Sequence, residues 1–326
     1  MSLNYFRGPL LMNTPCRLAL VRIIFVWLLF LLAMAPSSWS QNNDAASERQ
    51  RLARIQKLIE TLEPLHQKMP PVKRGDWLEA HPEKGQNFQE YKRSNPIALS
   101  STRNVLYVLP LGDFNDSQQK IVELSSEFLG IYFGCRVQTL KTLSIDDVIP
   151  EDARRIHPTW QVPQIKSTFV LEKLLPPLVP NDAVALICFT TSDLYPSDDW
   201  NFVFGQATYR TRVGVWSMYR NGDPDTEFDL CLKRTLRTAT HETGHMFSMP
   251  HCIAYQCNMC GSNSLQEADR WPLHLCPECV AKVIWSTRCD PAIRFKKLRD
   301  FCRENSLNEE ANYYSKVLNA MADGER

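Results

Sequence analysis

The sequence has little net charge and few histidines. The low net charge limits the classes of partner that the protein can bind, and the small number of histidines makes any cluster of them informative. Its 37 Lys and Arg residues are balanced by 36 Asp and Glu residues, and no basic run stands out. Nucleic-acid binding needs concentrated positive charge, so a nucleic-acid partner is not expected. With 326 residues, 44% of them hydrophobic, the chain can bury one sizeable core. Only seven residues are histidine, and three of these fall within residues 241–251, which makes that segment the most informative one.

The N-terminal segment lacks an apolar stretch long enough to span a membrane comfortably. The apolar run at residues 23–35 is short for a spanning helix. Three arginines and no acidic residue precede it, and the small residues Ser38 and Ser40 follow it. This arrangement predicts a signal peptide at residues 1–40, cut after Ser40, and a secreted or periplasmic protein. The alternative is an uncleaved membrane anchor, in which case the membrane would be a partner.

The motif His-Glu-Thr-Gly-His at residues 241–245 places His241 and His245 four residues apart. On a helix, residues at this spacing project from one face, so both imidazoles can face a single metal ion. Glu242 lies beside them, where its carboxylate can contact a water on the metal rather than the metal itself. His251 is too far along for the same helical face, so the chain must turn to bring it to the metal. Three neutral imidazoles with a fourth position open to water are typical of catalytic zinc.

Four cysteines follow the histidines in two close pairs, Cys252 with Cys257 and Cys276 with Cys279. Pairs at this spacing are typical of a four-thiolate zinc site, which is usually structural. We therefore expect two Zn²⁺ ions per chain, one catalytic and one structural. His274 leaves a Cys₃His ligand set as an alternative, although four cysteines fit the spacing better.

Met259, eight residues beyond His251, matches the methionine-bearing turn that underlies the histidines in metzincins. The whole pattern, His-Glu-x-x-His-x5-His-Cys-x4-Cys-x-Met followed by Cys-x-x-Cys, resembles the archaemetzincin (archaelysin) metallopeptidases. Their pattern joins a three-histidine catalytic zinc to an adjacent four-cysteine zinc. The resemblance implies a zinc-dependent peptidase that acts on a peptide or protein substrate, with Glu242 as the general base. The alternative is a catalytically inactive, zinc-stabilised binding module of the same fold.

One position departs from the family pattern. The family usually has glycine three residues after the second histidine, where the helix ends in a sharp turn that favours a left-handed residue. Ser248 stands there, followed by Met249 and Pro250. Serine can adopt the left-handed conformation at a cost of about 1 kcal/mol. We therefore expect the turn to form, and the position of His251 depends on it.

Upstream of the zinc motif, strand and helix patterns alternate. An apolar strand, a helix, a strand, a helix and a third strand follow one another, and this order favours parallel pairing with right-handed crossovers. Two closely spaced strands then precede the zinc helix and should pair antiparallel. Residues 145–165 show an irregular pattern, and Asp116 and Thr226–Asp229 are the expected helix caps. The expected strands are 105–109, 137–140, 183–189, 202–207 and 213–219, and the expected upstream helices are 116–131 and 169–175.

In metzincin-like folds, an antiparallel edge strand lies above the zinc helix and accepts the substrate. The resemblance implies this role for Phe204, Gly205, Gln206, Ala207 and Thr208, and strand addition to such an edge is a general mode of peptide capture. The predicted fold class is therefore α/β: a metzincin-like mixed sheet with an antiparallel edge strand, an active-site helix and a compact C-terminal subdomain stapled by zinc.

These patterns divide the chain into a signal peptide at 1–40, a helical and irregular extension at 41–100, a catalytic domain at 101–290 and a helical tail at 291–326. The extension has an apolar helical face between residues 45 and 65, which we expect to pack on the catalytic domain. It also contains a Trp and Gly-Gln-x-Phe-x-x-Tyr segment similar to one in the longer, animal-type archaemetzincins. Its expected role is to cover the domain rather than to take part in the chemistry.

Two further expectations concern side chains outside these motifs. Glu267 and Asp269 follow the methionine turn and are candidates to hold the metal ligands through hydrogen bonds. Among the cysteines outside the quartet, Cys289 and Cys302 are the pair expected to form a disulfide. The identity of the substrate, the cleavage preference and the oligomeric state have no signature in the sequence.

Overall fold

The computed structural model describes residues 37–324. The chain divides into two units between Arg54 and Ile55. Of the predicted signal peptide, all but the last four residues lie outside the described part. None of the helices within residues 37–324 combines the length and the hydropathy needed to cross a membrane.

The second unit contains a five-stranded sheet in the order β2-β1-β5-β8-β7 and a three-stranded sheet in the order β3-β4-β6. In the larger sheet β2, β1, β5 and β8 are parallel and β7 pairs antiparallel with β8. The predicted mixed sheet with an antiparallel edge strand is therefore confirmed. The strands are β1 Val105–Leu111, β2 Arg136–Thr139, β3 Arg154–Ile156, β4 Pro163–Lys166, β5 Ala183–Thr190, β6 Asp193–Tyr195, β7 Gly205–Ala207 and β8 Val213–Ser217.

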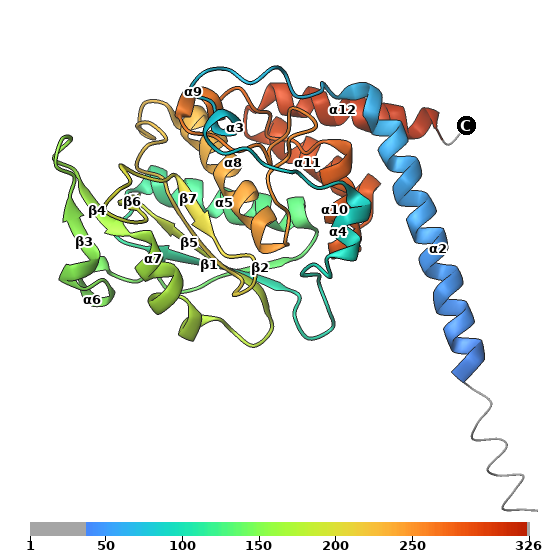
Figure 1. The fold of residues 1–326 in the computed structure, drawn as a ribbon, viewed down its shortest axis with the longest axis horizontal. Helices are drawn as coiled ribbons and strands as arrows, with labels where there is room; N and C mark the ends of the chain where they lie inside the picture. The colour runs from blue at the N-terminus through green and yellow to red at the C-terminus, as the bar shows by residue number, and fades with distance from the viewer. Residues whose placement is uncertain (1–36, 325–326) are drawn as a thin grey trace, which may run out of the picture. The chain divides into compact units, whose positions relative to one another are not determined.

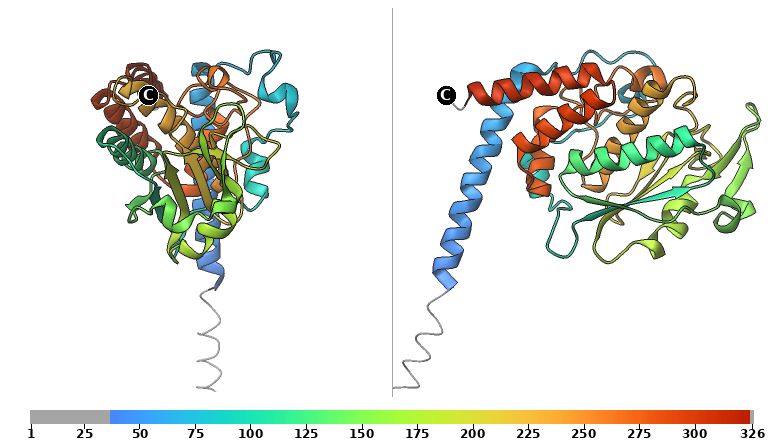
Figure 2. Two further views of the ribbon diagram at one scale, coloured as in Figure 1. Left: turned by 90° about the vertical axis from the view of Figure 1, so that its left-hand side faces the viewer. Right: turned by 180° about the vertical axis from the view of Figure 1, so that it is seen from behind.

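Helices cover both faces of the larger sheet. Figures 1 and 2 show α5, α8 and α10 to α12 on one side of it and α7 on the other. The α-helices are α2 Ser37–Leu62, α3 Trp77–Ala80, α4 Phe88–Arg93, α5 Asp116–Phe133, α6 Ile145–Val148, α7 Ser167–Phe169, α8 Phe228–Met246, α9 Leu265–Ala268, α10 Pro277–Thr287, α11 Pro291–Glu304 and α12 Asn308–Asp323. Short 3-10 segments are η1 Glu63–Leu65, η2 Glu151–Ala153 and η4 Pro176–Leu178, and α7 continues as a π-helix, η3 Val170–Leu174.

The two covered faces explain the apolar runs in the sequence. Every residue of β1 and of β5 is buried. Successive side chains of a strand point to opposite faces, so a strand covered on both sides must be apolar throughout. On one face Val105, Tyr107 and Leu109 join a core with η3 residues such as Val170 and Leu171.

Three local expectations are wrong. The N-cap of α5 is Asn115, one residue before the expected Asp116, and it forms a capping box with Gln118. The expected box at Thr226 and Asp229 is absent, because the Thr226 N–H is already bonded to the Asp223 carbonyl in a turn. Residues 145–165, expected to be irregular, contain strand β3 and most of β4. Strand β4 pairs with β3 and with β6 through backbone hydrogen bonds, although the sequence of these strands has no apolar alternation.

The expected Cys289–Cys302 disulfide is also wrong, because both residues are free cysteines. Cys302 is fully buried in α11. Cys289 instead lies next to Gly134, the C-cap residue of α5, which has a left-handed backbone conformation. A Cβ added to Gly134 would be 2.3 Å from the Cys289 Cβ.

Residues 55–100 are part of the second unit. Ile55, Leu58 and Leu62 on the last turns of α2 are buried, so this part of the predicted apolar face packs as expected. Backbone hydrogen bonds then attach the segment to distant parts of the chain, from Met69 N to the Ala254 carbonyl and from Leu99 N to the Ser286 carbonyl. The segment therefore runs across the loop that carries the metal motifs.

Candidate metal centres and active-site cleft

Helix α8 supplies the first two histidines. Leu232, Leu236 and Ala239 on its core face are fully buried, which fixes the rotation of the helix. His241 and His245 follow one turn apart on another face, and their Nε2 atoms lie 3.0 Å from each other. The spacing of the motif thus predicted their convergence correctly.

The turn after α8 forms in spite of the missing glycine. Ser248 has a φ of +66°, the left-handed conformation expected for this position. The Met249 N–H donates to the Gly244 carbonyl at 3.1 Å, and the Ser248 Oγ accepts a hydrogen bond from the Ile97 N–H at 3.2 Å. The reversal brings the ring of His251 to within 5.2 Å of that of His241.

The three histidines form one candidate metal site. One ring nitrogen of each of His241, His245 and His251 lies within 4.8 Å of the others. The Nδ1 of His241 donates to the Asn258 carbonyl at 2.8 Å, and that of His245 donates to the Met249 carbonyl at 2.7 Å. Carbonyl oxygens can only accept, so these bonds place the proton on Nδ1 and leave the Nε2 lone pair free for a metal.

The electrostatics of these two rings also favour a metal. Burial lowers the pKa of His241 to about 3 and holds the pKa of His245 well below its usual value. Both imidazoles are therefore neutral near pH 7, the state in which histidine binds zinc. Two Nε2 lone pairs 3.0 Å apart repel each other unless a cation lies between them. The donor set fits zinc.

The third ring has a partner that sequence reasoning missed. The Nδ1 of His251 donates to the Glu83 carboxylate at 2.7 Å, across 168 positions of the chain. The candidates from the sequence have other partners: Glu267 accepts the Trp77 N–H, and Asp269 pairs with arginines of α8. Nothing in the local sequence around Glu83 marks it as a partner, because only the tertiary fold brings it to His251.

Glu242 lies on the floor of the cleft, against the edge strand. The residue is 8% exposed, and burial raises the pKa of its carboxyl to about 8. A cation at the histidines would lower that pKa toward the range in which a carboxylate works as a general base. A Cβ on Gly205 in β7 would lie 2.9 Å from the Glu242 Cγ, so glycine allows the edge strand to approach this close.

The cleft above these residues has a volume of about 620 Å³. Four of the five predicted substrate-binding residues, 204–207, line it, whereas Thr208 does not and instead hydrogen bonds to the Val213 carbonyl. Aromatic rings form much of the remaining wall, and sequence reasoning did not single them out. They are Trp77, Trp200, Phe202 and Tyr209.

Met259 lies beneath the histidine helix, as predicted for a methionine turn. It is fully buried, and a Cβ on Gly244 would be 2.4 Å from its Sδ. The glycine within the histidine motif is therefore needed for the close approach of the turn. The Met259 carbonyl in turn accepts the Cys252 N–H at 2.8 Å, which ties this turn to the cysteine cluster.

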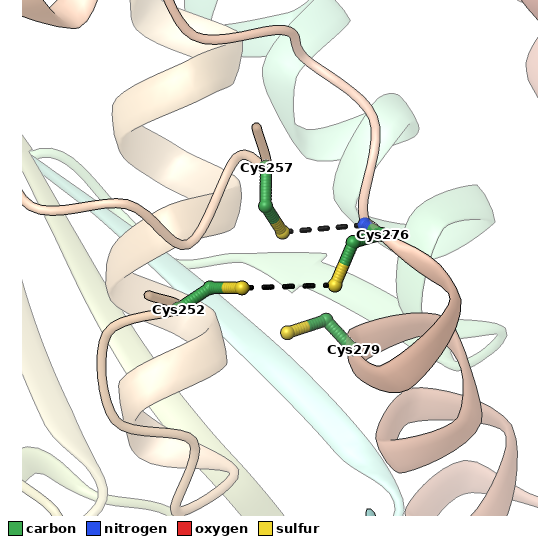
Figure 3. A group of neighbouring side chains, drawn as sticks. All are labelled: Cys252, Cys257, Cys276 and Cys279. Carbon is green, nitrogen blue, oxygen red and sulfur yellow. Dashed lines mark hydrogen bonds between the residues drawn. The ribbon is translucent and has the colours of Figure 1, made fainter. Parts of the chain in front are cut away.

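The four cysteines form a second candidate site. Figure 3 shows their sulfur atoms pointing toward one another from the loop at 252–257 and from the start of α10. All four are buried, and their sulfurs lie within 4.8 Å of one another. The Cys276 N–H donates to the Cys257 sulfur at 3.2 Å, as expected for a thiolate acceptor.

A cation is required for this cluster to be fully ionised. Burial and the neighbouring sulfurs raise the pKa of Cys257 and of Cys276 well above the usual value. Zinc overcomes this penalty, and four thiolates are its usual structural ligand set. His274 lies outside the cluster, with its ring stacked on Tyr313 at 3.5 Å, so the geometry favours Cys₄ over Cys₃His.

Comparison with known proteins shows which family the chain resembles. The model of "Peptidase family M54" matches residues 179–284. Archaemetzincin-2 of Rattus norvegicus is 29% identical over 309 residues, which cover 83% of this chain and 85% of the rat protein. Archaemetzincin-2 of Homo sapiens is 30% identical over 258 residues, 68% of this chain and 71% of the human protein. The crystal structure of archaemetzincin from Archaeoglobus fulgidus is 30% identical, covers 55% of this chain and 99% of that one, and has a TM-score of 0.44.

The protein is a zinc metallopeptidase, a hydrolase of peptide or protein substrates. The chain belongs to the archaemetzincin family. The predicted family and activity are confirmed, and none of these relatives favours the inactive alternative.

Proposed function

We propose that the chain hydrolyses peptide bonds at a catalytic zinc held by His241, His245 and His251, with Glu242 as the general base. The convergence of three imidazoles beside a buried glutamate on the floor of one cleft carries this proposal. Zinc held by the three histidines would supply a Lewis acid that activates water and polarises the scissile carbonyl. The Glu242 carboxylate would accept a proton from the water and donate it to the leaving amine.

The edge strand β7 supports the capture of an extended peptide. It is the last strand of its sheet, and Gly205 to Ala207 are half-buried on the wall of the cleft. A peptide that adds to this edge as a further strand would run directly above Glu242. The close approach of Gly205 to Glu242 supports this arrangement, because the scissile carbonyl of such a peptide would then lie within reach of the base.

We also propose a second, structural zinc at Cys252, Cys257, Cys276 and Cys279, so that the purified protein holds two Zn²⁺ per chain. The convergence of four buried sulfurs supports it. The near balance of charges supports the absence of a nucleic-acid partner.

Metal analysis together with peptide cleavage tests the catalytic proposal. Glu242→Gln should keep two zinc ions and lose turnover by about 10²–10⁴-fold, because only the proton acceptor is removed. His241→Ala should lose one zinc ion and all activity. Glu123→Gln, an exposed change on α5, is the matched control and should resemble the wild type. Wild-type cleavage rates in Glu242→Gln would contradict the mechanism.

We further propose that residues 1–40 are a signal peptide and that the mature enzyme acts outside the cytoplasm. The support is the arginine-rich start, the apolar run at 23–35 and the small residues before position 41. N-terminal sequencing of the mature protein should begin near Gln41. An intact Met1 on a membrane-bound protein would indicate the anchor, and an intact Met1 on a soluble cytoplasmic protein would exclude export.

A further inference from the structure

The segment that precedes the catalytic sequence reaches into the histidine site. Glu83 accepts a hydrogen bond from the His251 Nδ1 at 2.7 Å and one from the Trp77 indole Nε1 at 2.6 Å, both at the same carboxylate oxygen. The Trp77 ring also meets the His251 ring edge to face at 5.1 Å. Two residues of the extension therefore contact the third histidine directly.

His251 differs from His241 and His245 in the hydrogen-bond partner that orients its ring. His241 and His245 project from a long helix and donate to the backbone carbonyls of Asn258 and Met249, close to the same motif. His251 follows the left-handed residue Ser248 and lies in a loop outside any helix or strand. Its ring is oriented by a side chain, and that side chain carries a negative charge.

The carboxylate of Glu83 is itself held in place. Both Glu267 oxygens accept the Trp77 backbone N–H at 3.0 Å, and Glu267 is 4% exposed. Gly261 leaves room for the indole, since an added Cβ would be 2.4 Å from the Trp77 Cδ1. A chain of contacts thus runs from Glu267 through Trp77 and Glu83 to His251.

We propose that Glu83 is a positioning residue of the catalytic zinc site and that the extension completes that site. Its carboxylate keeps the His251 proton on Nδ1, aims Nε2 at the metal and makes the imidazole a stronger donor than a carbonyl partner would. The extension therefore does more than cover the domain, contrary to the expectation from the sequence. This inference rests on the proposed histidine zinc but does not depend on Glu242.

The test is the affinity of the full-length protein for its more weakly held zinc, measured by competition with a chelator. Partners of this kind change metal affinity by about 10–100-fold. Glu83→Ala should therefore weaken the histidine zinc by that factor and leave the cysteine zinc bound. Glu83→Gln can still accept a hydrogen bond without the charge, so its loss should be smaller. Glu79→Ala, an exposed change in α3 of the same extension, is the matched control and should bind zinc as the wild type does.

A merely structural role gives a different result. If Glu83 only anchors the extension, Glu83→Ala should lower the melting temperature while zinc affinity stays unchanged, and that outcome would overturn the proposal. Equal loss of zinc in Glu83→Ala and Glu79→Ala would also overturn it. If Glu83→Ala does not fold, Trp77→Phe is the second variant, because it removes the indole donor to Glu83 and keeps an aromatic ring. Trp77→Phe should measurably lower the affinity of the histidine site for zinc. An unchanged affinity would overturn the proposal.

The same measurements separate this inference from the proposed function. A His241→Ala protein that keeps both zinc ions would show that no zinc binds the histidines, and both proposals would fail together. A Glu242→Gln protein that cleaves peptides at the wild-type rate, combined with a Glu83→Ala protein that loses zinc, would refute the general base and leave the role of Glu83 intact.

Discussion

The two candidate metal centres lie next to each other in the chain and differ in nearly every physical respect. The histidine site lines an open cleft, and the His251 side chain is 16% exposed. The cysteine site is closed, with Cys257, Cys276 and Cys279 fully buried. An open zinc site leaves a position for water, whereas a closed one contributes folding energy. Two zinc ions bound as proposed would therefore divide catalysis and stability between two neighbouring sites.

The two sites are also coupled through the backbone. His251 and Cys252 are consecutive residues, and the Cys252 N–H bonds to the Met259 carbonyl beneath the histidines. A loop with little regular structure carries the third histidine, and Cys252 and Cys257 follow His251 in the same loop. Loss of the closed site should consequently disturb the open one, whereas loss of the open site should leave the closed one in place.

The largest expected effect is that of Cys276→Ser. It removes one of four ligands at the start of α10, and structural zinc contributes about 10 kcal/mol or more to folding in small zinc domains. The protein should lose the cysteine zinc, unfold at a much lower temperature and lose activity. Thermal unfolding and metal analysis measure this. Cys289→Ser, at a half-exposed cysteine outside the cluster, should change neither. Disulfides among the four cysteines in mass spectrometry would contradict the assignment.

The second expected effect is that of His251→Ala, which should be selective. Two imidazoles alone hold zinc poorly, so the histidine zinc and the activity should be lost. The cysteine zinc should remain, and the melting temperature should fall much less than in Cys276→Ser. A comparison of zinc content and unfolding for the two variants tests the proposed asymmetry. Equal destabilisation by both changes would mean that the two sites do not divide their roles in this way.

The third expected effect lies in the cleft alone. Gly205→Ala places a methyl group 2.9 Å from the Glu242 Cγ, so the glutamate or the edge strand must shift. A displacement of about 1 Å near the reacting groups can cost on the order of 10²-fold in rate. Both zinc ions should stay bound. Gly214→Ala on β8 meets its nearest atom at 3.3 Å and is the matched control. Equal activities of the two variants would remove Gly205 from the site.

The contrast between the sites also shows what the sequence could predict. The candidate metal ligands could be chosen from their spacing, because a helix repeat and two short cysteine pairs constrain local geometry whatever the rest of the fold does. The parallel strands followed from continuous apolar runs. The role of Glu83 could not be predicted from the sequence, because its contact with His251 joins residues 168 positions apart and depends on the path of the extension. Strands β3 and β4 were missed because they pair without the apolar pattern on which strand prediction rests.

The smallest expected effect concerns Ser248, where two opposing contributions to the free energy of unfolding nearly cancel. A left-handed φ of +66° costs a non-glycine residue about 1 kcal/mol, and glycine removes that cost. The serine hydroxyl, however, accepts the Ile97 N–H, a bond that contributes about 1 kcal/mol. Ser248→Gly loses the bond and the strain together, so its stability should stay within about 0.5 kcal/mol of the wild type.

Ser248→Ala separates the two terms at this turn, because alanine loses the hydrogen bond and keeps the left-handed strain. It should unfold about 1 kcal/mol more easily than both the wild type and Ser248→Gly in urea titrations of the zinc-loaded protein. Activity should be retained in the glycine variant, since the turn that places His251 is still made. Equal stabilities of the alanine and glycine variants would show that the left-handed conformation carries no cost here, and serine would then be as good a residue as glycine for bringing His251 to the metal.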